Sequence, residues 1–145
     1  MSERSDAVDA WEALYRAQVT VLRHLRADFP DDEVSFTEYD VLFNLYRQPD
    51  RSLRIRDLNR HLLLTQPSVS RLLDRLAARG LVTKSVDPDD GRGTVVTLSE
   101  SGLDVFRRVG AVHGEMIADR MTAALDQAEL RRLAELTDKL RAGSA

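Results

Sequence analysis

The sequence predicts a mainly α-helical fold with one small β-hairpin, held in a single domain that spans residues 1–145. Apolar residues recur at helical spacing through most of the chain, and they alternate at a spacing of two only between residues 81 and 98. Capping residues and glycines stand where these patterns begin and end. At 145 residues, of which 43% are hydrophobic, the chain is long enough to bury one core.

Two helices are predicted before residue 50. Residues 6–28 carry an apolar stripe with helical steps, made by Trp11, Leu14, Tyr15, Val19, Leu22 and Leu25. Ser35 and Glu38 have the spacing of a capping box, which opens a second helix over residues 35–47. Residues 48–52, QPDRS, are typical of a turn.

Two shorter helices follow, over residues 54–62 and 65–79. Thr65 is suited to cap the second of them, and Pro67 lies in its first turn, where a missing N–H costs little. Gly80 can adopt the left-handed conformation that ends it. This pair of helices is typical of a helix-turn-helix.

The spacing changes after Gly80. The segments LVTKSV (81–86) and TVVTL (94–98) are short and rich in β-branched residues, and the loop DPDDGRG between them is rich in turn formers, so a β-hairpin is predicted. Beyond it, Ser99 opens a long helix to about residue 124. Asp126 and Glu129 have the spacing of a second capping pair, and a leucine-rich stripe continues from there to residue 140.

Several functional classes are excluded by composition. The chain has no cysteine, which excludes disulfides, thiolate zinc sites and thiol-based sensing. The charged N-terminus MSERSDAVDAWEAL lacks the apolar stretch of a signal peptide, and no run approaches the ~20 apolar residues of a membrane helix. We therefore expect a cytoplasmic protein.

The motifs of common enzymes are missing too. There is no GxSxG, no HExxH and no glycine-rich phosphate loop, and His24, His61 and His113 fall on three separate predicted helices. DPDDGRG fails as a calcium loop because Leu98 stands where the bidentate glutamate belongs. We predict no catalytic residues, no metal and no cofactor. A metal site built from the histidines stays an alternative.

Positive charge is concentrated in one part of an acidic chain. The net charge is −3, yet residues 51–92 hold nine Lys/Arg against five Asp/Glu, a net charge of +4. Most of this excess precedes the acidic turn, since residues 51–86 hold eight against two. A local basic field suits an anionic partner that meets one surface only.

A helix-turn-helix followed at once by a hairpin predicts a winged helix-turn-helix, here over residues 35–100. The major groove of DNA admits one α-helix, whose N-terminal side chains reach base edges, so Arg71 can pair with guanine and Gln66 with adenine. The residues expected to contact DNA are Thr65, Gln66, Pro67, Ser68, Ser70, Arg71, Arg75, Arg92, Arg54, Arg56 and Lys84. The alternative is an ordinary helical hairpin whose arginines form a solvated face.

The hairpin loop carries one arginine among three aspartates. An arginine on a thin loop suits the narrow, electronegative minor groove, so Arg92 is predicted to enter it. Asp90 is expected to support the wing by pairing with Arg92 and holding its orientation. Asp87 and Asp89 are expected to shape the turn.

The terminal segments, residues 6–29 and 101–141, are predicted to be dimerisation helices. Their leucine-rich stripes exceed what a two-helix DNA reader with a wing requires. Two-fold pairing would bury them and place two recognition helices about 34 Å apart, one turn of B-DNA. The alternative is that both segments pack only on their own domain.

The segments LTQPSVSRLLDRLAARGLV and DPDDGRGTVVTLSESG resemble the MarR family of bacterial transcriptional regulators. The likeness extends from about Trp11 to Leu140. It implies an obligate homodimer that binds palindromic operators, with Gln66, Pro67, Ser68, Ser70 and Arg71 in the recognition helix. It also implies that Arg92 is the wing arginine and Asp90 its partner. Many members carry two adjacent arginines after that aspartate, whereas here the first is Gly91.

The same resemblance implies a small aromatic or phenolic effector, and with it a ligand-responsive repressor. Candidate contacts are Trp11, Tyr15, Arg16, Tyr39, Phe43 and His113. Aromatic residues at helical spacing are also typical of a core, which is the alternative for each of them. The peroxide-sensing members use cysteine, so that mechanism is excluded. The competing function is a non-catalytic interaction module that keeps the winged-helix fold and touches no nucleic acid.

Overall fold

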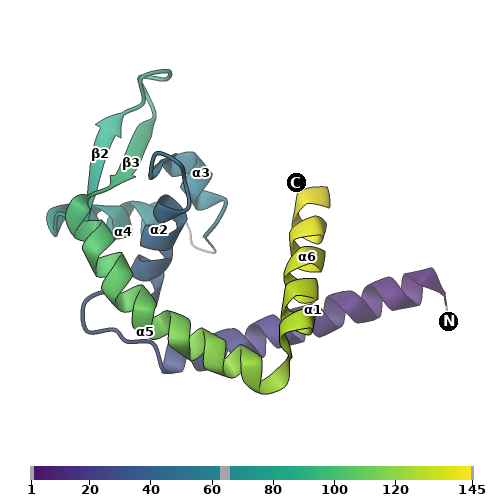
Figure 1. The fold of residues 1–145 in the computed structure, drawn as a ribbon. Helices are drawn as coiled ribbons and strands as arrows, with labels where there is room; N and C mark the ends of the chain where they lie inside the picture. The colour runs from purple at the N-terminus through teal and green to yellow at the C-terminus, as the bar shows by residue number, and fades with distance from the viewer. Residues whose placement is uncertain (1, 63–65, 145) are drawn as a thin grey trace. The chain divides into compact units, whose positions relative to one another are not determined.

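The computed structural model describes residues 2–62 and 66–144 (Figure 1). Its elements in order are α1 (Glu3–Ala27), α2 (Phe36–Tyr46), β1 (Ser52–Arg54), α3 (Ile55–Asn59), α4 (Gln66–Ala78), β2 (Val82–Val86), β3 (Thr94–Leu98), α5 (Glu100–Ala124) and α6 (Gln127–Gly143). They form two compact units. One comprises Phe29–Val112, and the other joins Met1–Asp28 to His113–Ala145. The predicted fold class, mainly helical with a small hairpin, is confirmed.

The strand β1 is the element that the sequence analysis missed. Residues 48–52 were predicted as a turn and residues 54–62 as a helix, but Ser52–Arg54 form a strand and α3 occupies only Ile55–Asn59. Three residues are too few for an alternating pattern. They become a strand because β3 lies beside them, with Leu53 opposite Val96.

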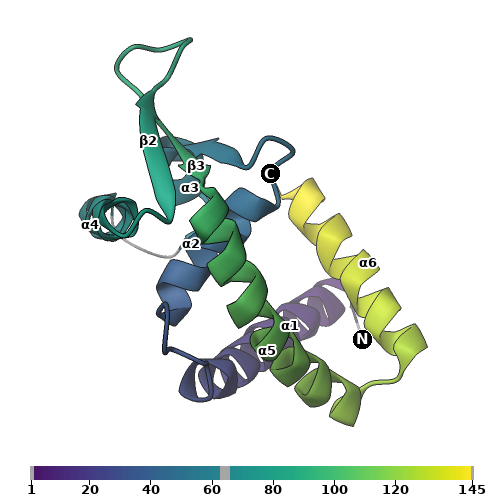
Figure 2. The same ribbon diagram turned by 60° about the vertical axis from the view of Figure 1, so that its left-hand side comes forward.

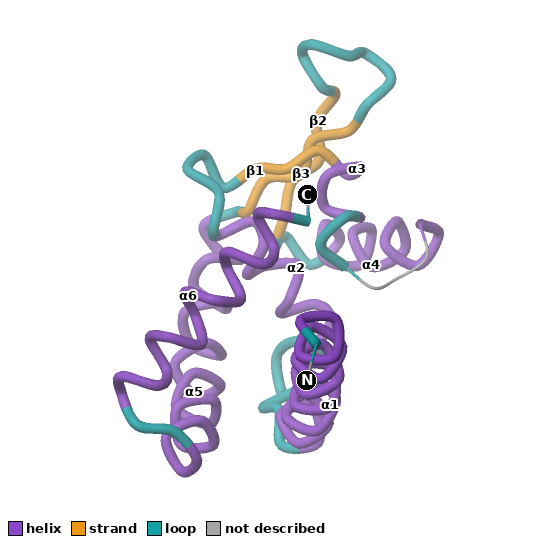
Figure 3. Tube along the Cα trace, turned by 90° about the vertical axis from the view of Figure 1, so that its right-hand side faces the viewer, coloured by secondary structure: helices purple, strands orange, loops and turns teal. Residues whose placement is uncertain are grey.

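The sheet has three antiparallel strands in the order β1-β3-β2. The predicted hairpin is confirmed, since Val82 pairs with Leu98 and Val86 with Thr94. Figure 3 shows the loop between β2 and β3 extending well beyond the rest of the sheet. Only the base of the hairpin is therefore held by a neighbouring third strand, and the loop projects as a wing.

The core of the unit 29–112 forms around one face of α4. Val69, Leu72, Leu73 and Leu76 are at most 2% exposed. They share this core with residues of α2, α3, the sheet and α5, among them Leu42, Leu45, Leu58, Val96 and Phe106. Burying each large apolar side chain stabilises the fold by about 1.5–3 kcal/mol, so the rotation of α4 about its axis is strongly determined.

The helix ends agree with the predicted capping residues. Ser35 with Glu38 and Asp126 with Glu129 both form complete capping boxes. Gly80 has φ +74°. The Ser99 hydroxyl accepts a hydrogen bond from the Gly102 N–H and donates one to the Gly80 carbonyl, which joins the start of α5 to the end of α4.

The other unit leaves much apolar surface uncovered. No residue of α1 or α6 is buried, and Leu136 is 46% exposed. Side chains from α1, the end of α5 and α6 line an apolar groove of about 650 Å³, among them Leu14, Val21, Met121, Leu133, Leu136 and Leu140. Within the described part of the chain, none of the helices combines the length and apolar character that crossing a membrane requires.

An ion pair fastens the wing to the start of α3. The Arg54 Nε lies 2.6 Å from the Asp87 Oδ2, and its Nη2 lies 3.2 Å from the Asp89 Oδ2. The Asp87 side chain is only 2% exposed. A hydrogen bond from the Asp89 N–H and, after it, the charge of Arg54 hold the pKa of Asp87 below its usual value, against the opposing effect of burial.

We predict that Asp87→Asn lowers the free energy of unfolding at pH 7, because the buried partner of Arg54 loses its charge. The lowered pKa means that the carboxylate stabilises the fold at pH values above its ordinary value of 3.8 and loses this effect as the pH falls further. Urea unfolding at pH 7 and at about pH 3 measures the free energy of unfolding of wild type and variant. The difference between the two proteins should be smaller at the lower pH.

The matched control is Asp89→Asn, because Asp89 is 81% exposed and pairs with the same arginine. It should destabilise the protein less, since exposed ion pairs contribute little. Equal effects of the two substitutions at pH 7 would contradict the role given to Asp87.

Candidate nucleic-acid interface

The face of α4 opposite the core presents polar and basic side chains. Pro67, Ser70, Arg71 and Arg75 are exposed, while Ser68 is partly buried. The Arg71 Nη2 lies 3.4 Å from the Ser68 Oγ, so the arginine is turned toward the start of the helix. Arg71 and Ser68 therefore lie together near the helix N-terminus, where base contacts are made in helix-turn-helix proteins.

Two predicted contacts cannot be placed in this geometry. Thr65 lies outside the described residues, and so does the side chain of Gln66. Their roles as helix cap and as adenine contact stay predictions.

The wing loop is closed by hydrogen bonds of its own. The Asp87 N–H donates to the Gly93 carbonyl at 3.0 Å, and the Gly93 N–H donates to the Asp90 carbonyl at 2.9 Å. The Asp90 Oδ1 accepts a hydrogen bond from the Arg92 backbone N–H at 3.1 Å. Asp90 thus supports the wing through the backbone.

The aspartate roles therefore differ from the sequence prediction. Asp90 was expected to pair with the Arg92 guanidinium, but its carboxylate shapes the turn. The ion pairs form instead between Arg54 and the two aspartates that were expected to shape the turn, Asp87 and Asp89. Asp87 also shapes the turn as expected, because its Oδ1 accepts a hydrogen bond from the Asp89 N–H. The spacing of two residues between Asp90 and Arg92 predicted a local ion pair. The strand β1, which was not predicted, instead places Arg54 beside Asp87 and Asp89.

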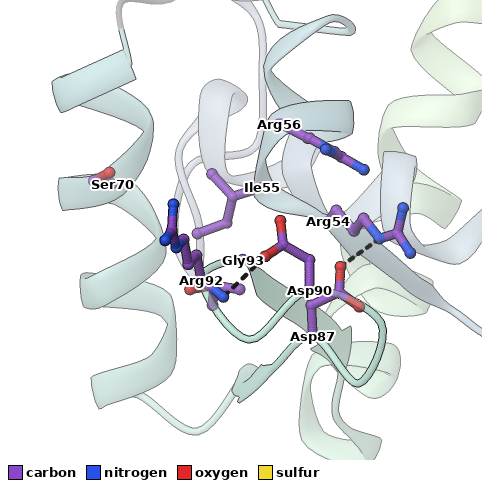
Figure 4. Close-up of a pocket in the computed structure, with 9 residues that line it drawn as sticks. Arg54, Ile55, Arg56, Ser70, Asp87, Asp90, Arg92 and Gly93 are labelled. Carbon is purple, nitrogen blue, oxygen red and sulfur yellow. Dashed lines mark hydrogen bonds and ion pairs between the residues drawn. The ribbon is translucent and has the colours of Figure 1, made fainter.

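A cleft of about 290 Å³ lies between the wing, α3 and α4 (Figure 4). It brings together Arg54, Arg56, Ser70 and Arg92, which come from three segments: the start of α3, α4 and the wing loop. In Figure 4 the Arg92 side chain points away from Asp90 and toward the helix that carries Ser70. A basic wing residue and the recognition helix therefore belong to one continuous surface.

The basic residues that were predicted to contact DNA, other than Arg71, fall into two groups. Arg56, Arg75 and Arg92 have exposed side chains on this surface. Arg54 and Lys84, in contrast, are held by acids of the same unit, because Arg54 pairs with Asp87 and Lys84 with Asp74. Neither pair could be predicted from the sequence, since the partners are 33 and 10 residues apart and lie on different elements, which only the folded structure brings together.

The predicted effector contacts are placed in two groups, one in each unit. Trp11 and Tyr15 are exposed on α1 with ring centroids 5.7 Å apart, and Arg16 pairs with Glu12. In the other unit Tyr39 stacks on Phe106 at 5.4 Å, and Phe43 lies 6.2 Å from the same ring. His113, in the same unit as α1, is buried, and this burial lowers its pKa.

The described residues give this surface no cluster of metal-binding side chains. Among residues 2–62 and 66–144, no group of three His, Asp or Glu side chains has the arrangement of a metal site. What the surface does present is a helix of suitable width with an arginine and serines near its start, and beside it a thin loop with one exposed arginine, Arg92. Such a surface matches the grooves and phosphates of duplex DNA.

Comparison with known proteins supports the same conclusion. The sequence model described as MarR family matches residues 33–93. An HTH-type transcriptional regulator of Mycobacterium bovis is 31% identical over 126 residues, which cover 83% of this chain and 84% of the relative.

Solved structures share the fold over nearly the whole chain. A MarR family regulator from Streptomyces coelicolor, solved in complex with DNA, has a TM-score of 0.74 at 24% identity and covers 99% of this chain and 89% of its own. BpsR from Bordetella bronchiseptica, whose DNA binding is regulated by 6-hydroxynicotinic acid, has a TM-score of 0.69 at 25% identity, with coverage of 90% and 91%. Given the identity and coverage of the mycobacterial relative, the chain belongs to the MarR family of transcriptional regulators.

Proposed function

We propose that this protein regulates transcription by binding a palindromic operator as a homodimer, with α4 in the major groove and the wing at the adjacent minor groove. It acts in the cytoplasm, without catalysis and without a cofactor. The observation that carries the proposal is the orientation of α4. Its apolar stripe is buried, so Ser70, Arg71 and Arg75 face outward beside the wing.

The charges of the surface support DNA over a protein partner. The outward side of α4 and the wing presents arginines in a chain whose net charge is −3. A protein-interaction module has no need to gather cations on the one helix whose shape fits the major groove. The S. coelicolor regulator, which has the same fold, was solved in complex with DNA.

The groove between α1, α5 and α6 supports the homodimer. Its lining is almost wholly apolar, and Leu133, Leu136 and Leu140 at its edge are 37–53% exposed. Apolar surface of this extent marks an interface. A second copy would cover it, and two-fold symmetry would present two α4 helices to two half-sites.

A small aromatic acid is the effector class that we propose for the regulator. BpsR responds to 6-hydroxynicotinic acid, and this chain carries exposed aromatic side chains at Trp11, Tyr15 and Phe43. Such a ligand can change DNA affinity only if it binds two conformations of the protein unequally. With a higher affinity for the conformation that does not bind DNA, it would relieve repression.

Arg71→Ala tests the recognition helix. DNA retained by the pure protein from a random pool gives the operator, and affinities are then measured for each single-base change in one half-site. We expect Arg71→Ala to lose about 1–3 kcal/mol of discrimination at one base position, because a bidentate guanine contact disappears. Arg107→Ala, which removes an exposed arginine of α5, is the control and should leave the profile unchanged. A wild-type protein that retains no DNA, or a variant with an unaltered base profile, would count against the proposal.

Leu136→Glu tests the dimer. A charge placed in the apolar groove should favour the monomer, which sedimentation velocity detects, and should weaken operator binding because the second half-site contact is lost. Arg131→Glu is the control, since this exposed residue of the same helix is absent from the groove lining. A Leu136→Glu protein that stays dimeric would refute this assignment of the interface.

Gly91→Arg tests the wing. A Cβ at Gly91 meets nothing within 4 Å, so the arginine that the family resemblance implies at the first position after Asp90 fits here. We expect tighter operator binding and a steeper fall of log K with log salt, by about 0.9 for one added phosphate contact. Gly91→Ala should change neither quantity. An unchanged salt slope in Gly91→Arg would argue against wing contact with DNA.

A further inference from the structure

The presented side of α4 carries a carboxylate among its cations. Asp74 is the one acidic residue between Gln66 and Ala78, and its side chain is 66% exposed. By helical spacing it stands one turn beyond Ser70 and Arg71, near the pole opposite the buried stripe. If α4 lies in the major groove, Asp74 enters it too.

A carboxylate at this position opposes DNA binding. The groove is bordered by phosphates, and like charges brought together at an interface cost several-fold or more in affinity. Arg71 and Arg75 on the same side of the helix attract the duplex, while Asp74 repels it. Arg71, three residues before Asp74, is turned toward Ser68, and the position four residues after Asp74 is Ala78.

The neighbouring strand supplies the missing cation. Lys84 on β2 forms an ion pair with Asp74, and its own side chain is 36% exposed. Lys84 stands opposite Val96 in the ladder with β3, so its position is set by the sheet. Figure 2 shows α4 beside the base of the β2–β3 hairpin. The ion pair connects these two elements.

We propose that Lys84 serves DNA binding by neutralising Asp74 and not by contacting a phosphate. The pair then allows α4 to approach the groove, and it also couples the recognition helix to the wing. This inference rests on the proposed function, since it assumes that α4 meets DNA. It assigns Lys84 and Asp74 as positioning residues of the recognition surface.

Two other roles are chemically open to these residues and make different predictions. Lys84 as a phosphate contact would act independently of Asp74. Asp74 as a base contact would accept a hydrogen bond from the cytosine N4 amino group, and its loss would relax specificity at one position. The two substitutions, made singly and together, separate these roles.

The test is a double-mutant cycle on the full-length protein with the operator selected by the wild type. The variants are Asp74→Asn, Lys84→Gln and the double variant, with Lys84→Arg as the conservative control. We expect Lys84→Gln to lose about tenfold in affinity or more, because an unneutralised carboxylate then faces DNA. Asp74→Asn should bind at least as well as wild type, and the double variant should return to within about twofold of Asp74→Asn. Lys84→Arg should stay within about twofold of wild type.

Three outcomes would overturn the inference. A double variant as weak as Lys84→Gln would make Lys84 a phosphate contact, and a Lys84→Gln protein that binds normally would remove its role. An Asp74→Asn protein with relaxed preference at one base pair would make Asp74 a base contact. In each case the wild type still binds its operator, so the proposed function stands; a wild type that binds no DNA contradicts both.

Loss of folding is distinguished by urea unfolding of all five proteins. The pair is largely exposed, so its removal should change stability only slightly.

Discussion

The burial of one stripe on α4 is the constraint on which the rest of the surface depends. Val69, Leu72, Leu73 and Leu76 are held in the core of the 29–112 unit, and each would lose its burial if the helix turned about its axis. The burial of this stripe therefore also determines which side chains of α4 are exposed on its opposite side. Arg71, the serines and Asp74 face outward as a consequence of packing, before any ligand is considered.

Ion pairs as well as strand hydrogen bonds hold the wing in position. β2 and β3 hold its base, while the buried carboxylate of Asp87 draws Arg54 from the start of α3 against the loop. Lys84 and Asp74 make a second connection, from β2 to α4. Two residues that look like phosphate contacts in a basic stretch are thus engaged within the protein. Among the basic residues that were predicted to contact DNA, Arg56, Arg71, Arg75 and Arg92 are exposed.

The two units divide the requirements of a regulator of this family. The unit 29–112 contains the buried hydrophobic core, and the outward face of α4 in it is polar. The other unit has exposed leucines and an apolar groove, so it needs a further surface to cover it. Gly91 leaves Arg92 as the one cation in the loop sequence between β2 and β3.

The sequence by itself determined the helices, their caps and the hairpin, because each depends on neighbours within a few residues. The capping boxes at Ser35 and Asp126 and the left-handed Gly80 could all be predicted in this way. Only the tertiary structure decided β1, which exists because β3 pairs with it, and the partners of Arg54 and Lys84, which lie on other elements. A local pattern carries no information on which distant charge will fold against a given arginine, and that contact decides whether the arginine faces DNA or supports the wing.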